Sequence, residues 1–409
     1  MQPGEQTQAA ATTQPVPLPV IAREWARIGI TGFGGPPAHI ALLRRLCVQR
    51  NAWISAAEFE DGIAATSLLP GPASTQLAIF CGWRLAGPLG AVVAGVCFIA
   101  PGLVIILGLS ALFLQHAPPA WVTGAADGAG ASVPAIAVAA AGGLMPASWR
   151  RPGRAVRARA RWIIYLLAGA VAANLAGEFL VVVLLACGLL EWLVSRPRRA
   201  EGRAADAARP ADDRRTKGPA AMLAPFAAKA VAVGGLGSLA WVAVKVGALS
   251  FGGGFVIIPL MQHDAVHTYH WMTTAQFLGA VALGQVTPGP VVLTVGVVGY
   301  AAAGVAGCLL AVLVAFTPSF AFVMAGGRHF DAFRRTRGAQ TFLGGAGPAA
   351  IGAIAGAAIT LGLGLTQVWQ VAVLVLAAGW LLALRRGVVP AILGAAAIGV
   401  VVALAGGLS

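Results

Sequence analysis

The sequence predicts an all-α polytopic membrane protein built from two inverted-topology repeats, with about ten crossings and two re-entrant helical hairpins broken at Pro-Gly-Pro. Three observations predict this fold: the apolar composition, an internal repeat and the placement of basic loops. Hydrophobic residues make up 58% of the 409 residues and charged residues 10%, with a mean hydropathy of +0.81. A soluble protein carries about 25% charged residues, so the composition indicates a membrane protein.

Long apolar segments define the predicted crossings. A run of about 18 apolar residues forms a helix long enough to span a bilayer, and continuous runs favour helices over the alternating strands of a barrel. We expect crossings at residues 18–33, 88–114, 119–147, 162–177, 179–195, 222–250, 304–325, 338–363, 366–384 and 388–408.

The second half of the chain repeats the first at a constant spacing of 218 residues, the distance from Phe33 to Phe251. Phe33-Gly34-Gly35 aligns with Phe251-Gly252-Gly253, and Pro70-Gly71-Pro72 aligns with Pro288-Gly289-Pro290. The register is expected to continue without a gap as far as Phe98, opposite Phe316. Repeats of this size in a membrane protein indicate a transporter or a channel.

Basic residues occupy alternate loops in the two halves. In the first half they follow Phe33-Gly34-Gly35 and Pro70-Gly71-Pro72, and they also fill residues 150–161. In the second half they stand in the loops that lack them in the first, at Arg328, Arg334, Arg335, Arg337, Arg385 and Arg386. Because basic loops stay in the cytoplasm, the halves are predicted to be inverted. The net charge of +14 is then explained by topology rather than by nucleic-acid binding.

Four regions follow from these patterns. Residues 1–17, rich in Gln, Thr, Ala and Pro, are expected to be a disordered tail, and the charged stretch 196–221 a cytoplasmic linker. The membrane repeats are residues 18–195 and 222–409.

Each Pro-Gly-Pro (PGP) motif separates two short segments, 56–69 from 73–86 and 274–287 from 291–303. Proline removes an N–H and ends the preceding helix, while glycine permits a sharp turn. The following half-helix then begins with unpaired N–H groups and a positive dipole end, which together favour an anion. Short full crossings, or plain proline kinks in packing helices, remain alternatives.

Two matched cations, Arg27 and Lys245, precede the FGG motifs within apolar segments. Cations inside a membrane usually face a cavity or a partner, although snorkelling to an interface is the simpler explanation. The FGG glycines permit an unwound turn or merely a tight helix crossing. The predicted substrate-binding residues are Arg27, Lys245, Gly34, Gly35, Gly252, Gly253, Pro70, Gly71, Pro72, Ser74, Thr75, Gln76, Gln285, Pro288, Gly289, Pro290 and Thr294.

Ion coupling is assigned to Asp61 or Glu60, with His39 as a gating or titrating residue. Carboxylates also suit a helix start, so Glu58, Glu60 and Asp61 have a purely structural alternative. The five cysteines show no metal-binding spacing, and we expect neither a metal nor a cofactor. The sequence contains no enzyme motif of the kinds with a recognised mechanism.

Taken together, these motifs are similar to those of the chromate ion transporter (CHR) family in its long, two-domain form. The residues that carry the match are Phe33–Pro36, Ala38–Ala41, Leu69–Pro72, Ser74–Ala78, Phe251–Gly254, Trp271, Gln285, Pro288–Pro290, Gly299, Tyr300 and Pro318–Phe320.

The resemblance implies gradient-driven efflux of chromate across a bacterial inner membrane, with sulfate as a competitor of like shape and charge. The family often has Gln where this chain has Ser67, and Asp where it has Gly279; these departures bear on substrate choice and coupling. The alternatives are a transporter of sulfate or another small anion, and a membrane enzyme or scramblase acting on lipid phosphate. The expected partners are the anion, the lipid bilayer and a second copy of the chain in a homodimer.

Overall fold

The computed structural model describes residues 15–66, 69, 71–150, 155–175, 180–195, 235–250, 257–326 and 337–406. Every regular element within these ranges is a helix, as expected. Most of the predicted tail, the linker 196–221, and the predicted site residues Pro70, Gly252 and Gly253 lie outside the described residues.

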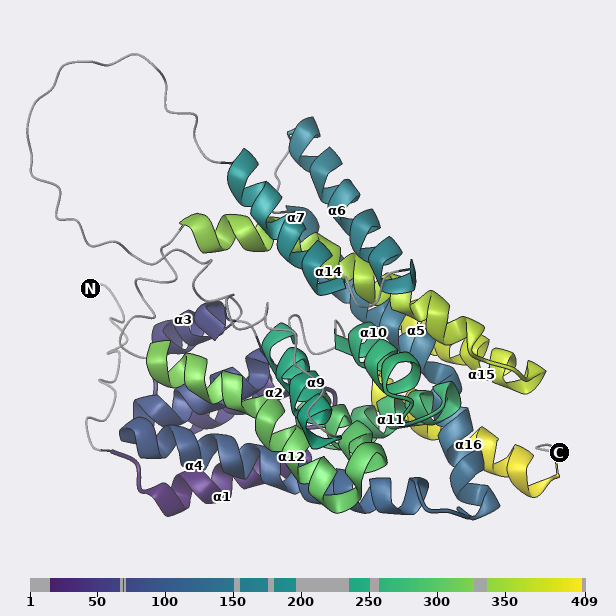
Figure 1. Ribbon diagram of the computed structural model, residues 1–409. Helices are drawn as coiled ribbons and strands as arrows, with labels where there is room; N and C mark the ends of the chain where they lie inside the picture. Colours follow the sequence, from purple (N-terminus) through teal and green to yellow (C-terminus); the bar gives the residue numbers. More distant parts are fainter. Residues whose placement is uncertain are drawn as a thin grey trace, which may run out of the picture.

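Figure 1 shows the helices in chain order. They are α1 (Leu18–Thr31), α2 (Pro36–Arg44), α3 (Ala56–Thr66), α4 (Ala73–Phe113), α5 (Ala120–Arg150), α6 (Val156–Leu175), α7 (Leu180–Val194), α9 (Leu236–Leu249), α10 (Ile257–Gln262), α11 (Thr274–Val286), α12 (Thr294–Gly326), α14 (Arg337–Leu363), α15 (Val368–Ala378) and α16 (Val388–Leu404). The π-helical turns η1 (Arg45–Arg50), η4 (His263–Thr268) and η6 (Gly379–Ala383) extend α2, α10 and α15, and the 3-10 turn η5 (Val291–Leu293) precedes α12.

Among the described residues, four helical stretches are long and apolar enough to cross a membrane, namely Ala73–Phe113, Ala120–Arg150, Val291–Ala325 and Gln340–Leu363. Several shorter apolar helices accompany them. Their outward side chains are also apolar, as shown by Val104 and Leu313, which are each 70% exposed. Exposed apolar surface on this scale is typical of a lipid-facing protein. The chain is therefore a multi-pass, all-α membrane protein.

The helices break where the sequence predicts. α3 ends before the first PGP motif and α4 begins just after it, while α11 ends before the second and η5 follows. Within α4 the backbone leaves the helical region at Ala86 and Gly87, where the predicted half-helix 73–86 ends. Proline and glycine act locally, so their effect on the backbone can be predicted from the sequence.

Local backbone geometry recurs in both halves, but the predicted register is wrong after the PGP motif. Gly71 and Gly289 share a positive φ, of 127° and 108°. The kink of α4 at Gly87, however, recurs in α12 at Gly304, one position earlier than the constant spacing requires. The 3-10 turn η5 stands where the first half has ordinary α-helix. A 3-10 turn rises about 2.0 Å per residue against about 1.5 Å, which lets the second half span the turn with one residue fewer.

The helices form two groups, each built from both halves of the chain (Figure 1). In the first, which we call the PGP lobe, α4 packs against α1, α2, α3 and α12, and α12 packs against α9. In the second, which we call the bundle, α6 and α7 pack on α14, while α15 and α16 pack on α5. α11 packs against both α5 and α12 and so connects the bundle to the PGP lobe.

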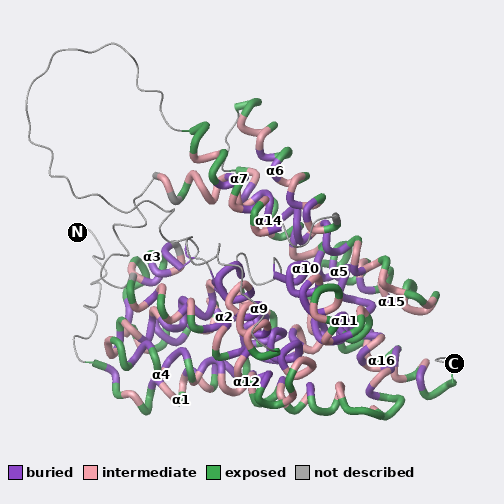
Figure 2. Tube along the Cα trace, in the orientation of Figure 1, coloured by how far each residue is buried: buried purple, intermediate pink, exposed green. Residues whose placement is uncertain are grey.

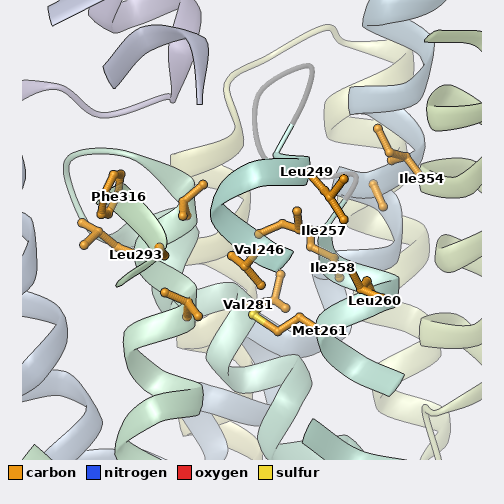
Figure 3. Close-up of a cluster of buried hydrophobic side chains, with 14 of the residues drawn as sticks. Val246, Leu249, Ile257, Ile258, Leu260, Met261, Val281, Leu293, Phe316 and Ile354 are labelled. Carbon is orange, nitrogen blue, oxygen red and sulfur yellow. The ribbon is translucent and has the colours of Figure 1, made fainter. Parts of the chain in front are cut away.

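Buried residues concentrate along α9, α10 and α11 and the adjoining stretch of α12 (Figure 2). Figure 3 shows part of this core, in which Val246 of α9 and Met261 of α10 lie beside Val281 of α11. All three side chains are fully buried. Burying such side chains contributes about 1.5–3 kcal/mol each where the alternative is water. This core fixes the helices that lead to the second PGP turn.

One pair of elements was not predicted. Pro36 and Pro37 begin a helix of their own, α2, directly after the FGG turn. Proline suits the first turn of a helix because the N–H groups there have no partner in any case. The counterpart of this helix in the second half is α10.

The contact between α6 and α14 depends on glycine, and replacing Gly352 with alanine is expected to lower the stability of the folded protein. A methyl group on Gly352 would overlap the carbonyl oxygen of Leu166 in α6. Overpacking of this kind costs about 1–3 kcal/mol. The matched control is Gly347→Ala on the same helix, where a methyl group meets nothing within 4 Å. Thermal unfolding in detergent measures the difference, and equal midpoints for the two variants would contradict it.

Candidate functional site

The first FGG motif forms a glycine turn between α1 and α2. Gly34 and Gly35 have φ values of 99° and 72°, a region that residues with a Cβ rarely adopt. The turn brings α2 back against the end of α1. It thereby places His39, in the first turns of α2, beside the carbonyl group of Gly32.

The Gly32 carbonyl joins this turn to the second PGP motif. Its oxygen accepts a hydrogen bond from the N–H of Gly289 over 3.1 Å. It also lies 2.8 Å from Nε2 of His39. A carbonyl oxygen only accepts, so Nε2 carries the hydrogen. Two donors from distant parts of the chain therefore meet on one backbone oxygen.

His39 also reaches the first PGP motif. Its Nδ1 lies 3.3 Å from the Ser74 hydroxyl in the first turn of α4. With Nε2 protonated, a neutral imidazole accepts at Nδ1, so the Ser74 hydroxyl donates. The ring is fully buried and packs edge-on against Phe98, with centroids 5.0 Å apart. The predicted residues His39, Ser74 and Gly289 thus belong to one network that links the two PGP turns.

Glycine allows the second turn to approach the PGP lobe closely. A Cβ on Gly102 of α4 would lie 2.5 Å from the carbonyl oxygen of Pro288, so only glycine fits there. Gly35 also faces this region, since its Cβ would lie 3.8 Å from Val291. The FGG turn of the first half therefore packs against the PGP turn of the second half.

Each PGP turn is followed directly by a helical start. Pro72 is the N-cap of α4 and Pro290 the N-cap of η5. The first N–H groups of a helix have no intrahelical acceptor and carry a partial positive charge. Such a start can hold an anion when other donors converge on it.

Several buried polar atoms at these motifs have no hydrogen-bond partner among the described residues. They are Oγ1 of Thr75, Nε2 of Gln285, Oγ of Ser250 and Oγ of Ser319. Leaving a polar group buried without a partner costs about 1–3 kcal/mol, so each atom calls for a ligand or a water molecule. Their number and position favour a polar ligand at the turns.

Ser319 and Ser250 were not among the predicted site residues. Ser319, in α12, lies beside the first PGP turn, since a Cβ on Gly71 would sit 3.1 Å from its hydroxyl and 2.5 Å from Nε2 of Gln76. Ser319 belongs to the Pro318–Phe320 motif that carries the family resemblance, and this is the signal that could have identified it. Thr294, by contrast, donates its hydroxyl to the carbonyl of Val291 over 2.8 Å, so this donor is already used within its own helix.

The two matched cations have different environments. Arg27 lies on the exposed face of α1, and Thr31 one turn later is also exposed. Lys245 is largely buried and pairs with Asp264 of η4, with Nζ 2.5 Å from Oδ2. Its ammonium group also lies 5.8 Å from the ring centroid of Trp241. This ion pair was not predicted, and it compensates the charge that Lys245 was expected to offer to an anion.

The carboxylates proposed for coupling lie at the surface of α3. Glu60 pairs with Arg44 over 2.7 Å, and Glu58 pairs with Arg84. Glu58 stands in the first turn of α3, as a structural helix-start role requires, and Asp61 is exposed. Within the described residues, no group of three or more His, Cys, Asp or Glu side chains could hold a metal ion.

Comparison with known proteins agrees with these motifs. The family model described as chromate transporter matches residues 20–192 and 237–400. The chromate transport protein of Cupriavidus metallidurans is 32% identical over 87% of this chain and 86% of its own length. The chromate transport protein of Pseudomonas aeruginosa is 31% identical over 88% and 85%. The probable chromate transport protein of Synechococcus elongatus is 30% identical over 84% of each chain.

No solved structure matches the chain. The matching relatives are named as transport proteins, and the matching family is one of transporters rather than enzymes. The match covers both halves at nearly full length. The chain belongs to the chromate transporter family.

Proposed function

We propose that this protein exports chromate from the cytoplasm across a bacterial inner membrane, driven by the membrane gradient. The names of its relatives support chromate as the transported anion. Export by a secondary transporter would confer chromate resistance. Sulfate, which has the same tetrahedral shape and charge, is the expected competitor.

The observation that carries this proposal is the network through which the Gly32 carbonyl and His39 join the two PGP turns. A dianion with four oxygens needs several donors that converge from different directions. Helix starts at Pro72 and Pro290, together with the unpartnered groups of Thr75, Gln285 and Ser319, are suited to supply them.

The proposed architecture is a pair of inverted repeats, residues 18–195 and 222–409, joined by a cytoplasmic linker at 196–221. The alternating basic loops support it. In this arrangement the PGP turns enter as re-entrant hairpins from opposite sides of the membrane. Irregular backbone at membrane depth is tolerated where it lines a cavity. A homodimer is compatible with this arrangement.

Arg27 is proposed to attract the anion toward the site from the exposed face of α1. Replacing Arg27 with glutamine is expected to slow chromate transport about tenfold at low salt, and less at high salt, because long-range attraction is screened. The control is Arg23→Gln, which removes an exposed positive charge one turn earlier on the same helix. Initial transport rates measured at two ionic strengths test this. Equal loss in both variants would contradict a specific role for Arg27.

The direct test of the function is chromate uptake into everted membrane vesicles. Export from the cell corresponds to uptake into such vesicles, so energised vesicles containing the protein should accumulate chromate, and an ionophore should abolish the accumulation. Added sulfate should compete. Accumulation of sulfate, with no uptake of chromate, would favour the sulfate transporter instead.

A further inference from the structure

A polar cavity lies where α11 meets the bundle, away from the PGP turns. Its volume is about 220 Å³. It is lined by Asp127 and Gly130 of α5, by Thr273–Ala275 and Leu278 at the start of α11, by Gly364–Thr366 between α14 and α15, and by Gln370 in the first turn of α15. Its lining combines one carboxylate with hydroxyl and amide groups.

Among the described residues that line this cavity, Asp127 alone is ionisable. It makes no hydrogen bond or ion pair with any residue that the structure describes. It is partly buried, in the apolar helix α5. An unpaired carboxylate in a membrane span is costly and is by default a functional candidate.

The helices packed around α5 offer Asp127 little charge. α11, α15, η6 and α16 contain no ionisable side chain. In α4 and α14 the ionisable side chains are those of Cys81, Arg84, Cys97 and Arg337. Arg337 begins α14, whose other end reaches the cavity, and a helix of that length is about 40 Å long. None of the described side chains on these helices therefore pairs with Asp127, which leaves its carboxylate free to bind a cation.

α11 connects this cavity to the anion site. It begins at the cavity with a capping box between Thr273 and Gln276, and it ends just before the second PGP turn, about 20 Å away. The positive dipole end of α11 favours an ionised Asp127. Neutralising Asp127 would weaken its attraction for the start of α11. It would thereby change the contact between the bundle and α11, the helix that leads to the second PGP turn.

We propose that the Asp127 cavity is the binding site for the monovalent cation, a proton or Na⁺, that is exchanged for the anion. This inference rests on the proposed export function and gives the coupling role to a residue other than Glu60 or Asp61. A single carboxylate with neutral oxygen ligands suits one positive charge, whereas Ca²⁺ takes six to eight oxygen ligands and often several carboxylates.

The test compares two modes of transport in vesicles that contain wild-type protein or Asp127→Asn. Under an imposed cation gradient, we expect the variant to accumulate at least tenfold less chromate than the wild-type protein. It should keep exchange of external for internal chromate within about twofold of wild type. Gradients of pH alone and of Na⁺ alone, imposed in separate arms, identify the cation. Asp127→Glu, which keeps the carboxylate, should retain the response to the gradient.

Glu24→Gln is the matched control, because Glu24 is another partly buried carboxylate, on α1. It should behave as wild type. Two results would overturn the inference while leaving the export function intact. One is full gradient-driven accumulation by Asp127→Asn. The other is the loss of both exchange and accumulation in a variant that is correctly inserted. Absence of any chromate exchange by the wild-type protein would overturn the export function and the inference with it.

Discussion

Replacing His39 with phenylalanine is expected to slow chromate transport at least about tenfold while leaving the folded protein in the membrane. Phenylalanine, although larger than histidine, keeps an aromatic ring at this position for the edge-on contact with Phe98. It removes both polar contacts of the ring, those with the Gly32 carbonyl and with the Ser74 hydroxyl. Each lost hydrogen bond leaves a buried polar group without a partner, which costs about 1–3 kcal/mol. A cost of that size in the arrangement that transports the anion lowers the transport rate at least about tenfold.

The measurement is chromate uptake into everted vesicles, normalised to the amount of correctly inserted protein. The matched control is His116→Phe, since His116 is exposed between α4 and α5. Because His39 connects both PGP turns, its loss should reduce the maximal rate as well as the apparent affinity. Wild-type transport by His39→Phe would show that the network does not position the turns for transport.

The sequence predicted the helix breaks well because their causes are local. The PGP motifs, the glycines of the FGG motif and the end of segment 73–86 each act through the dihedral angles of a few residues. Matched motifs in the two halves also indicated where polar groups would gather. Ser74, Thr75 and Gln285 lie in or beside the turns for that reason.

The contacts between the two halves could not be predicted in this way. The hydrogen bond from Gly289 to Gly32 and the approach of Ser319 to Gly71 depend on how distant helices pack, which leaves no trace in the spacing of residues. The one-residue register shift was invisible for a related reason. A change from α-helix to a 3-10 turn absorbs it, and no residue type uniquely marks that change. Asp127 carries no motif at all.

Replacing Asp264 with alanine is expected to destabilise the protein by about 3–5 kcal/mol. Lys245 and Asp264 are both largely buried, with side chains only 14% and 7% exposed. Removing the carboxylate leaves an uncompensated ammonium group in the interior, and breaking a buried pair costs about that much. The yield of monodisperse protein in detergent and its unfolding temperature measure the loss.

Exchanging both partners for apolar residues tests what the pair does. The double variant Lys245→Met with Asp264→Leu leaves no buried charge, and such replacements are often neutral or stabilising. We therefore expect it to recover the stability that Asp264→Ala loses. Because the charge of Lys245 is already compensated in the structure, the double variant should also transport chromate within about threefold of wild type. A stable double variant that cannot transport would instead show that Lys245 releases Asp264 and meets the anion during the cycle, as its match with Arg27 first suggested.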